Sequence, residues 1–158
     1  MRMDLPVDEE AALDAPSDED LAACETFAST CHPDCIACRP RSLRGLGLVF
    51  RLAPDGSAIA RFPCDPGFQG YPDRLHGGII ATLLDAAMTH RLFASKIRAY
   101  TARMDLRYLE PVELEEEVSV RAQLTKAKPP WFFLRADLSQ GGRTRVTAEA
   151  VFRADPAD

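Results

Sequence analysis

Four stretches in the second half of the chain alternate apolar and polar residues with a period of two. In one of them Val118, Val120 and Ala122 alternate with polar side chains. Because successive side chains of a strand point to opposite faces, this pattern is typical of antiparallel strands with one covered face. It predicts strands over residues 100–109, 117–126, 131–139 and 143–153.

A different pattern occupies residues 79–94, which are almost wholly apolar on more than one helical stripe. It predicts an enclosed helix. Two shorter β-prone runs, residues 46–52 and 57–62, precede this helix and are separated by Ala-Pro-Asp-Gly-Ser, a hairpin signal. The predicted order is therefore two strands, one helix and four strands. A single helix covers a sheet of this size by lying across its concave face, so we expect an α+β domain.

The N-terminal part differs in composition from the rest of the chain. Residues 1–16 combine acidic residues with Pro and Ala and are expected to form a loose arm, whereas residues 17–29 can form a short helix with Ser17 as its N-cap. An irregular, cysteine-rich segment follows. We therefore expect an N-terminal part over residues 1–42 and a folded domain over residues 43–158.

Length and charge narrow the class of protein. The chain has 158 residues and a formal net charge of −5. This length suits one domain with a hydrophobic core. The negative charge argues against a general affinity for nucleic acid, and no apolar run reaches the roughly 18 residues of a membrane span. The N-terminus lacks the basic and then apolar order of a signal peptide. We expect a cytoplasmic protein that binds neither nucleic acid nor membranes.

One carboxylate, Asp85, interrupts the apolar helix. A buried carboxylate is costly unless it is paired or used, so Asp85 is a candidate general base or nucleophile. At the start of the helix, Gly77 lets a ligand approach the backbone, and first-turn N–H groups suit a developing negative oxygen. The two residues are eight positions apart, about 12 Å along a helix. One reacting carbonyl cannot contact both, so a shared chemistry requires two copies of the chain at a two-fold interface.

The chain resembles the hotdog-fold acyl-CoA thioesterases of the phenylacetate-pathway (PaaI-like) type. The resemblance rests on HGGIIATLLDAAM, on its lead-in FQGYPDRL and on TARMDLRYLEPVEL, and it covers residues 43–153. It implies a hotdog fold, in which one long central helix is wrapped by a six-stranded antiparallel sheet. It also implies active sites at a dimer interface, an acyl-CoA substrate and no cofactor required for catalysis. The expected assembly is a homodimer or a dimer of dimers, that is, a homotetramer.

The same resemblance implies roles for individual residues. The N–H of Gly77 polarises the thioester carbonyl, and Asp85 from the other copy activates water or attacks directly. Thr101, on the strand after the helix, helps to hold the water. His76 is a further candidate catalytic residue, and its alternative role is to cap or brace the loop before the helix.

Two positions depart from the family pattern. Gly70 stands where a polar residue is common, and Ala86 follows the aspartate where many relatives have Glu. A non-catalytic acyl-CoA-binding or regulatory protein is therefore the alternative to a thioesterase that releases free acid and CoA. A hotdog dehydratase or hydratase is a third hypothesis, but most of its motifs are absent.

Four cysteines lie within 15 residues in the N-terminal part: Cys24, Cys31, Cys35 and Cys38, with His32 among them. The Cys-x3-Cys-x2-Cys spacing falls in the range of structural zinc sites, in which four sulfur or nitrogen ligands surround the metal. Such a site could order a segment that has few apolar residues to pack. A structural zinc ion held by these cysteines, thiols without metal, and a disulfide or redox role are the three alternatives.

Overall fold

A computed structural model of the chain describes residues 18–156, with side chains from Glu25 onward. The predicted loose arm and the N-cap Ser17 lie outside the described residues. Six strands form one antiparallel sheet in the order β1-β2-β4-β5-β6-β3. Their bounds are β1 Arg51–Leu52, β2 Ala58–Pro63, β3 Ala99–Tyr108, β4 Glu117–Lys128, β5 Trp131–Gln140 and β6 Arg143–Ala154.

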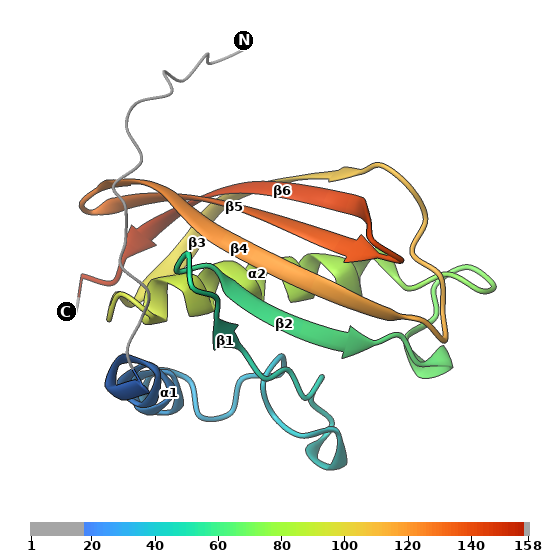
Figure 1. The fold of residues 1–158 in the computed structure, drawn as a ribbon, viewed down its shortest axis with the longest axis horizontal. Coiled ribbons are helices and arrows are strands. Elements are labelled where there is room, and N and C mark those ends of the chain that lie inside the picture. The colour runs from blue at the N-terminus through green and yellow to red at the C-terminus, as the bar shows by residue number, and fades with distance from the viewer. Residues whose placement is uncertain (1–17, 157–158) are drawn as a thin grey trace, which may run out of the picture.

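The helices are α1 (Asp18–Cys31) and α2 (Gly77–Phe93), with two short 3₁₀ turns, η1 (Arg41–Leu43) and η2 (Pro66–Phe68). The sheet curves around α2, which lies against its concave face, while α1 lies at one side near the end of α2 (Figure 1). This is the predicted α+β arrangement of one long helix and a six-stranded antiparallel sheet.

The core lies between α2 and the sheet. Leu83, Leu84, Ala87 and Met88 are fully buried, which confirms the enclosed helix that the apolar run predicts. On the sheet side, every second residue of β4 from Val118 to Ala122 is buried as well. The apolar residues that recur with a period of 3.6 in the helix and of 2 in the strands therefore face the same interior.

The strand predicted over residues 46–52 is wrong for most of its length, because only Arg51 and Leu52 pair with β2. The backbone N–H groups of Leu46 and Leu48 instead donate to the carbonyls of Ile36 and Ala37 in the cysteine-rich segment. The β-prone run thus satisfies its backbone groups outside the sheet. Hydrogen bonds therefore join the two sides of the predicted boundary at residues 42 and 43, and the division into two parts stays a prediction.

Strand β3 forms one edge of the sheet and also departs from simple alternation. Its pairing with β6 shifts between Thr101 and Arg103, so one extra residue, Ala102, is accommodated there by a β-bulge. Ala102 is exposed, whereas Met104 and Leu106 are half-buried against the core. After the bulge, the residues predicted to face the core do so at Met104 and Leu106. Before the bulge, the predicted alternation is wrong.

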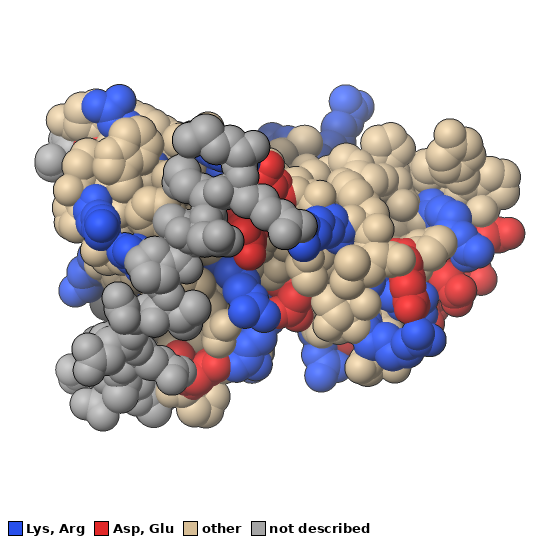
Figure 2. All heavy atoms as spheres, turned by 90° about the horizontal axis from the view of Figure 1, so that it is seen from above, with Lys and Arg blue, Asp and Glu red and all other residues tan. Residues whose placement is uncertain are grey.

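Charged side chains are mixed over the described surface. Figure 2 shows Lys and Arg interspersed with Asp and Glu on one face, without a continuous basic area among the described residues. Several of these groups form surface ion pairs, such as Arg61 with Glu117 and Arg143 with Glu110. None of the helices in residues 18–156 is both long enough and apolar enough to cross a membrane.

Candidate functional site

His76 caps the N-terminus of α2. Its backbone is extended, with φ −62° and ψ 132°, and its Nδ1 accepts a hydrogen bond from the N–H of Gly78 at 2.9 Å. A side chain that accepts from the first turn satisfies one of the unpaired donors of a helix start. A Cβ at Gly78 would lie only 3.1 Å from the imidazole, so a glycine is required for this close approach. His76 thus makes the contact expected of a cap, and its catalytic role stays a prediction.

The first residue of α2, Gly77, presents an unused donor. No group in the described part of the chain accepts a hydrogen bond from the N–H of Gly77. Its carbonyl accepts one from the hydroxyl of Tyr108 at 2.9 Å, which ties the helix start to the end of β3. A free N–H at a helix N-terminus is suited to an anionic oxygen.

Asp85 and Thr101 are brought into contact. The hydroxyl of Thr101, on β3, donates to Oδ1 of Asp85 at 2.5 Å, across the edge where β3 passes α2. Asp85 is half-buried and Thr101 is exposed. The carboxylate is therefore not enclosed in the core as its apolar neighbours suggest, because it lies on the side of α2 that faces the sheet edge.

The two halves of the predicted site are separated within one chain. Gly77 is the first residue of α2 and Asp85 is the ninth, about 12 Å further along the axis. His76 and Gly77 thus form one group at the start of the helix, and Asp85 and Thr101 form a second group at its middle. A surface hollow near the helix start is lined by Gln69, Arg74 and neighbours, and neither Asp85 nor Thr101 lines it.

The loop before α2 packs closely on its cap. A Cβ at Gly70 would lie 3.2 Å from Cα of His76, so the loop passes the cap at a distance that favours glycine. In the same loop, Nη1 of Arg74 lies 3.7 Å from Oε1 of Glu113, and the backbones of these two residues form an isolated β-bridge. Gly70, which departs from the family pattern, therefore has a local packing reason.

Sequence reasoning did not predict the contact of Tyr108 with Gly77, because the two residues are 31 positions apart. No local signal marks Tyr108 among the other aromatic residues of the chain. Only the course of β3 past the start of α2 brings its hydroxyl to the helix.

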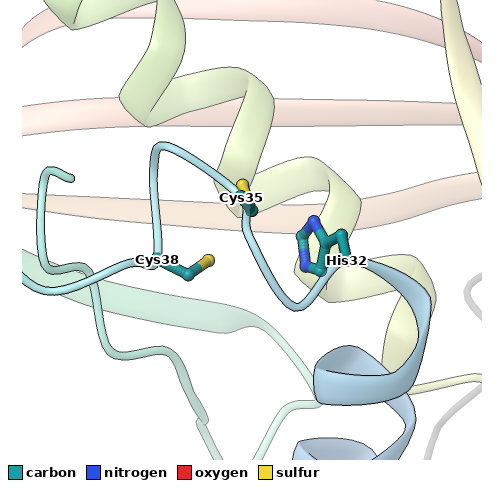
Figure 3. Close-up of side chains that lie close together, drawn as sticks. All are labelled: His32, Cys35 and Cys38. Carbon is teal, nitrogen blue, oxygen red and sulfur yellow. The ribbon is translucent and has the colours of Figure 1, made fainter. Parts of the chain in front are cut away.

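A second cluster of reactive side chains lies in the segment after α1. The ligand atoms of His32, Cys35 and Cys38 all lie within 4.8 Å of one another (Figure 3). Of the predicted cysteines, the structure brings together Cys35 and Cys38. Cys31, the last residue of α1, is not part of this group of described residues, and the side chain of Cys24 lies outside the described part of the chain.

His90, in the last turn of α2, borders the cysteine-containing cluster. Its Nε2 lies 3.1 Å from Sγ of Cys38, and its ring stacks on Phe50 with centroids 4.2 Å apart. The ring centroids of His32 and His90 are 5.3 Å apart. The cluster thus lies where the N-terminal segment meets the central helix, and the sequence spacing did not reveal the contact of His90 with Cys38.

Burial dominates the electrostatics of this cluster. Desolvation lowers the pKa of His32, and desolvation together with the nearby His32 lowers the pKa of His90 to about 4. Burial, followed by the charge and hydrogen bond of Cys35, raises the pKa of Cys38 to about 12. Without a bound cation, the imidazoles of the two histidines and the Cys38 thiol are therefore neutral near pH 7.

Comparison with known proteins shows which proteins this chain resembles. Residues 73–147 match the model of the thioesterase superfamily. The acyl-coenzyme A thioesterase THEM4 of Bos taurus is 28% identical over 110 residues, which is 68% of this chain and 45% of the bovine protein. The chain therefore spans less than half the length of this relative.

Solved structures show the same fold. The PaaI protein of the Escherichia coli phenylacetic acid degradation operon superposes with a TM-score of 0.72 at 12% identity, covering 85% of this chain and 94% of that one. A thioesterase of Streptococcus pneumoniae TIGR4, solved with coenzyme A, gives a TM-score of 0.64 at 16% identity and covers 68% and 87% of the two chains.

The chain therefore has the hotdog fold, and its residues 73–147 are similar to the thioesterase superfamily. This confirms the fold class and the family resemblance that the His-Gly-Gly motif and the aspartate of the helix predict.

Proposed function

We propose that this protein hydrolyses an acyl-CoA thioester to a free acid and CoA. A water molecule attacks the thioester carbonyl, with Asp85 as the base that accepts its proton, or Asp85 attacks the carbonyl directly and forms an anhydride that water then hydrolyses to the free acid. The oxyanion that forms is held by the N–H of Gly77 at the start of α2. Collapse of the intermediate releases the CoA sulfur, which takes up a proton as the thiol.

The contact between Asp85 and Thr101 carries this proposal. A hydroxyl that donates to one carboxylate oxygen at 2.5 Å fixes the carboxylate and leaves the other oxygen for water. Thr101 is exposed and Asp85 half-buried, so a substrate can reach the pair. The unpaired N–H of Gly77 supplies the complementary electrostatic element, a kind of contribution that is worth roughly 3–4 kcal/mol where it has been measured.

Relatives support both the substrate class and the residue pair. The bovine relative is named an acyl-coenzyme A thioesterase, and the Streptococcus pneumoniae thioesterase binds coenzyme A. That thioesterase has also been solved with an aspartate replaced by alanine and with a threonine 16 positions later replaced by alanine. Asp85 and Thr101 are likewise 16 positions apart.

The site that we propose is completed by a second copy of the chain. Gly77 and Asp85 are too far apart along α2 to act on one carbonyl, so each active site combines Gly77 of one protomer with Asp85 of its partner. The edge strand β3, which carries Thr101 and exposed Tyr100 and Tyr108, is the surface through which we propose that two copies meet. The homodimer, or a dimer of dimers, and the cytoplasmic location stay predictions.

Replacement of the catalytic pair tests this function. We expect Asp85→Asn, which retains shape and loses the base, to lower kcat on acyl-CoA substrates by about 10²–10⁴-fold. Thr101→Val, which removes the donor to the carboxylate, should lower kcat by about tenfold with little change in KM, as expected for one lost hydrogen bond. Release of free CoA thiol is the measurement, over short, long and aromatic acyl-CoAs.

Glu117→Gln is the matched control, because Glu117 is an exposed carboxylate on β4 that pairs with Arg61, so this variant should retain activity. Full activity of Asp85→Asn would contradict the assignment. Tight binding of acyl-CoA by the wild-type chain without any turnover would favour a non-catalytic acyl-CoA-binding protein instead.

A further inference from the structure

The segment between α1 and β1 has little regular secondary structure. Residues 32–50 contain turns and one 3₁₀ turn but no strand. Ile36, Leu43 and Val49 are more than half exposed, and Ala37, Leu46 and Leu48 are its buried apolar side chains. A segment of this kind, lying against the end of a hotdog domain, is a place where a bound metal can supply order that packing does not.

Backbone turns in this segment gather side chains that can bind a metal. The N–H of Cys35 donates to the carbonyl of His32, and the N–H of Cys38 donates to the carbonyl of Cys35. These two successive turns bring the ligand atoms of all three residues within 4.8 Å of one another. In Figure 3 the thiol of Cys38 and the imidazole of His32 point toward each other, beside α2.

His90, on the central helix, borders this group of three residues. Nε2 of His90 lies 3.1 Å from Sγ of Cys38, and the His90 ring is 5.3 Å from that of His32. In a tetrahedral zinc site with Zn–S near 2.3 Å and Zn–N near 2.0–2.1 Å, neighbouring ligand atoms are roughly 3.3–3.8 Å apart. The ligand atoms of His32, Cys35 and Cys38, which lie within 4.8 Å of one another, and Nε2 of His90 would reach this geometry by moving closer together, through changes of side-chain torsion angles.

An independent observation marks the cluster as a ligand site. Nε2 of His32 is buried and has no hydrogen-bond partner within the described residues. A buried polar atom without a partner is costly, and a metal ion is one of the few groups that would satisfy it in this position.

We propose that His32, Cys35, Cys38 and His90 bind one zinc ion, which fixes the N-terminal segment to the C-terminal end of α2. Two thiolates and Zn²⁺ give a site without net charge, and the two imidazoles complete a closed Cys₂His₂ set. Such a site is structural, since it leaves no open position for water or substrate. Of the four cysteines that the spacing suggests, two serve as ligands, and histidines provide the other two.

The first test is the metal content of the full chain. Protein purified from zinc-supplemented medium without chelators should contain about one zinc ion per chain, and Co²⁺ bound to the apoprotein should give the absorption of a tetrahedral site with thiolate ligands. Cys38→Ser and His90→Gln should each weaken zinc binding by at least about 10-fold. Protein that binds no zinc under reducing conditions with Zn²⁺ added would overturn the proposal.

Two control variants separate metal binding from packing. Cys64→Ala removes a buried thiol that lies outside the cluster, and Phe50→Leu removes the ring that stacks on His90 while leaving all four ligands. Both variants should bind zinc with wild-type stoichiometry. If Phe50→Leu lost zinc as fully as His90→Gln, the role of His90 would be packing and the four-ligand assignment would be wrong.

The zinc site and the thioesterase can be tested apart. The cluster includes the last turn of α2, whereas the proposed oxyanion donor is at its first residue. Removal of zinc by a chelator should lower the midpoint of thermal unfolding and increase proteolysis within residues 32–50, with kcat on acyl-CoA retained at temperatures where the protein stays folded. Unchanged unfolding and proteolysis after zinc removal would contradict a structural role, whatever the result of the Asp85→Asn experiment.

Discussion

At the scale of single residues, the proposed chemistry depends on two hydrogen-bond donors, a backbone N–H at the start of α2 and a side-chain hydroxyl beside its middle. The N–H of Gly77 has no acceptor within the described residues, and the hydroxyl of Thr101 donates to Asp85. Both donors are needed in the proposed mechanism because one stabilises the developing oxyanion and the other holds the carboxylate that activates water.

Gly77→Pro tests the backbone donor without removing the helix. Proline has no N–H, and it is well tolerated at the first position of a helix. The preceding residue, His76, has ψ 132°, which a residue before proline readily adopts. We expect kcat to fall by about 10²–10³-fold, measured as thiol release, with a far-ultraviolet circular dichroism spectrum like that of the wild type.

Gly77→Ala is the matched control for this variant, because it keeps the N–H. A Cβ at this position would lie 3.6 Å from the hydroxyl of Tyr108, an ordinary contact. Equal losses of activity in the proline and alanine variants would show that crowding, rather than loss of the donor, impairs catalysis.

How far single residues could be predicted depends on the distance between partners in the sequence. Asp85 and Gly77 stand out locally, one as a carboxylate in an apolar helix and the other as a glycine at its start. The contacts of Tyr108 with Gly77 and of Cys38 with His90 span 31 and 52 positions, and no local pattern predicts them. Such contacts arise only when strand and loop pass the helix in the folded chain.

At the scale of elements, the turn between β1 and β2 shows how local sequence sets a hairpin. Oδ1 of Asp55 accepts from the N–H of Ser57 at 3.0 Å, and Gly56 adopts a positive φ of 76°. The second carboxylate oxygen contacts Arg121 on β4. The Pro-Asp-Gly signal predicts this turn because the side chain of Asp and the freedom of Gly both stabilise it.

The pH dependence of stability should report on this turn. Hydrogen bonds from Ser57, aided by Arg121, lower the pKa of Asp55 to about 2, compared with about 3.9 in an unfolded chain. A lowered pKa in the folded state contributes stability above the unfolded pKa, and this contribution is lost as the pH falls from about 4 through about 2. Asp55→Ala should therefore be less stable than the wild type at pH 7.

Urea unfolding at several pH values measures this difference. The gap in the free energy of unfolding between the wild type and Asp55→Ala should narrow between about pH 4 and pH 2. A gap that stays constant down to pH 2 would contradict a role for ionised Asp55 in the turn.

Among the elements, the four long strands and the central helix follow their periodic patterns closely. The exceptions have physical reasons. Residues 46–50 have the composition of a strand, but the carbonyls of the cysteine-rich segment take their backbone donors. The bulge at Ala102 interrupts alternation on β3, where one edge of the strand has no paired strand among residues 18–156 to impose a register.

At the scale of the whole molecule, the proposed dimer assigns the two groups of site residues of one chain to different active sites. The proposed dimer makes each site from the helix start of one copy and the helix middle of the other. This arrangement predicts a specific result when two inactive chains are combined, because complementary defects leave one intact site in a mixed dimer.

We expect mixed dimers of Asp85→Asn and Gly77→Pro chains to recover activity. In a mixed dimer one site carries both defects and the other carries none. After random assortment half of the dimers are mixed, so about a quarter of all sites should be active. Chains co-expressed with different affinity tags, or refolded together, provide the sample, and thiol release is the measurement.

A double variant, Gly77→Pro with Asp85→Asn, mixed with Asp85→Asn supplies the control, since no dimer of this pair has an intact site. Recovery of activity no greater than in this control would mean that both groups act within one chain. An active protein that light scattering shows to be a monomer would mean the same.

Local sequence patterns were sufficient for the helix, the long strands, the hairpin turn and the two residues at the centre of the proposed chemistry. Each of these depends on neighbours within a few positions, where periodicity and turn chemistry act. The folded arrangement was needed to show that Thr101 reaches Asp85, that Tyr108 holds the helix start, and that His32 and His90 join two of the four cysteines. These contacts depend on how the sheet curves around α2, which brings together residues that no sequence spacing relates.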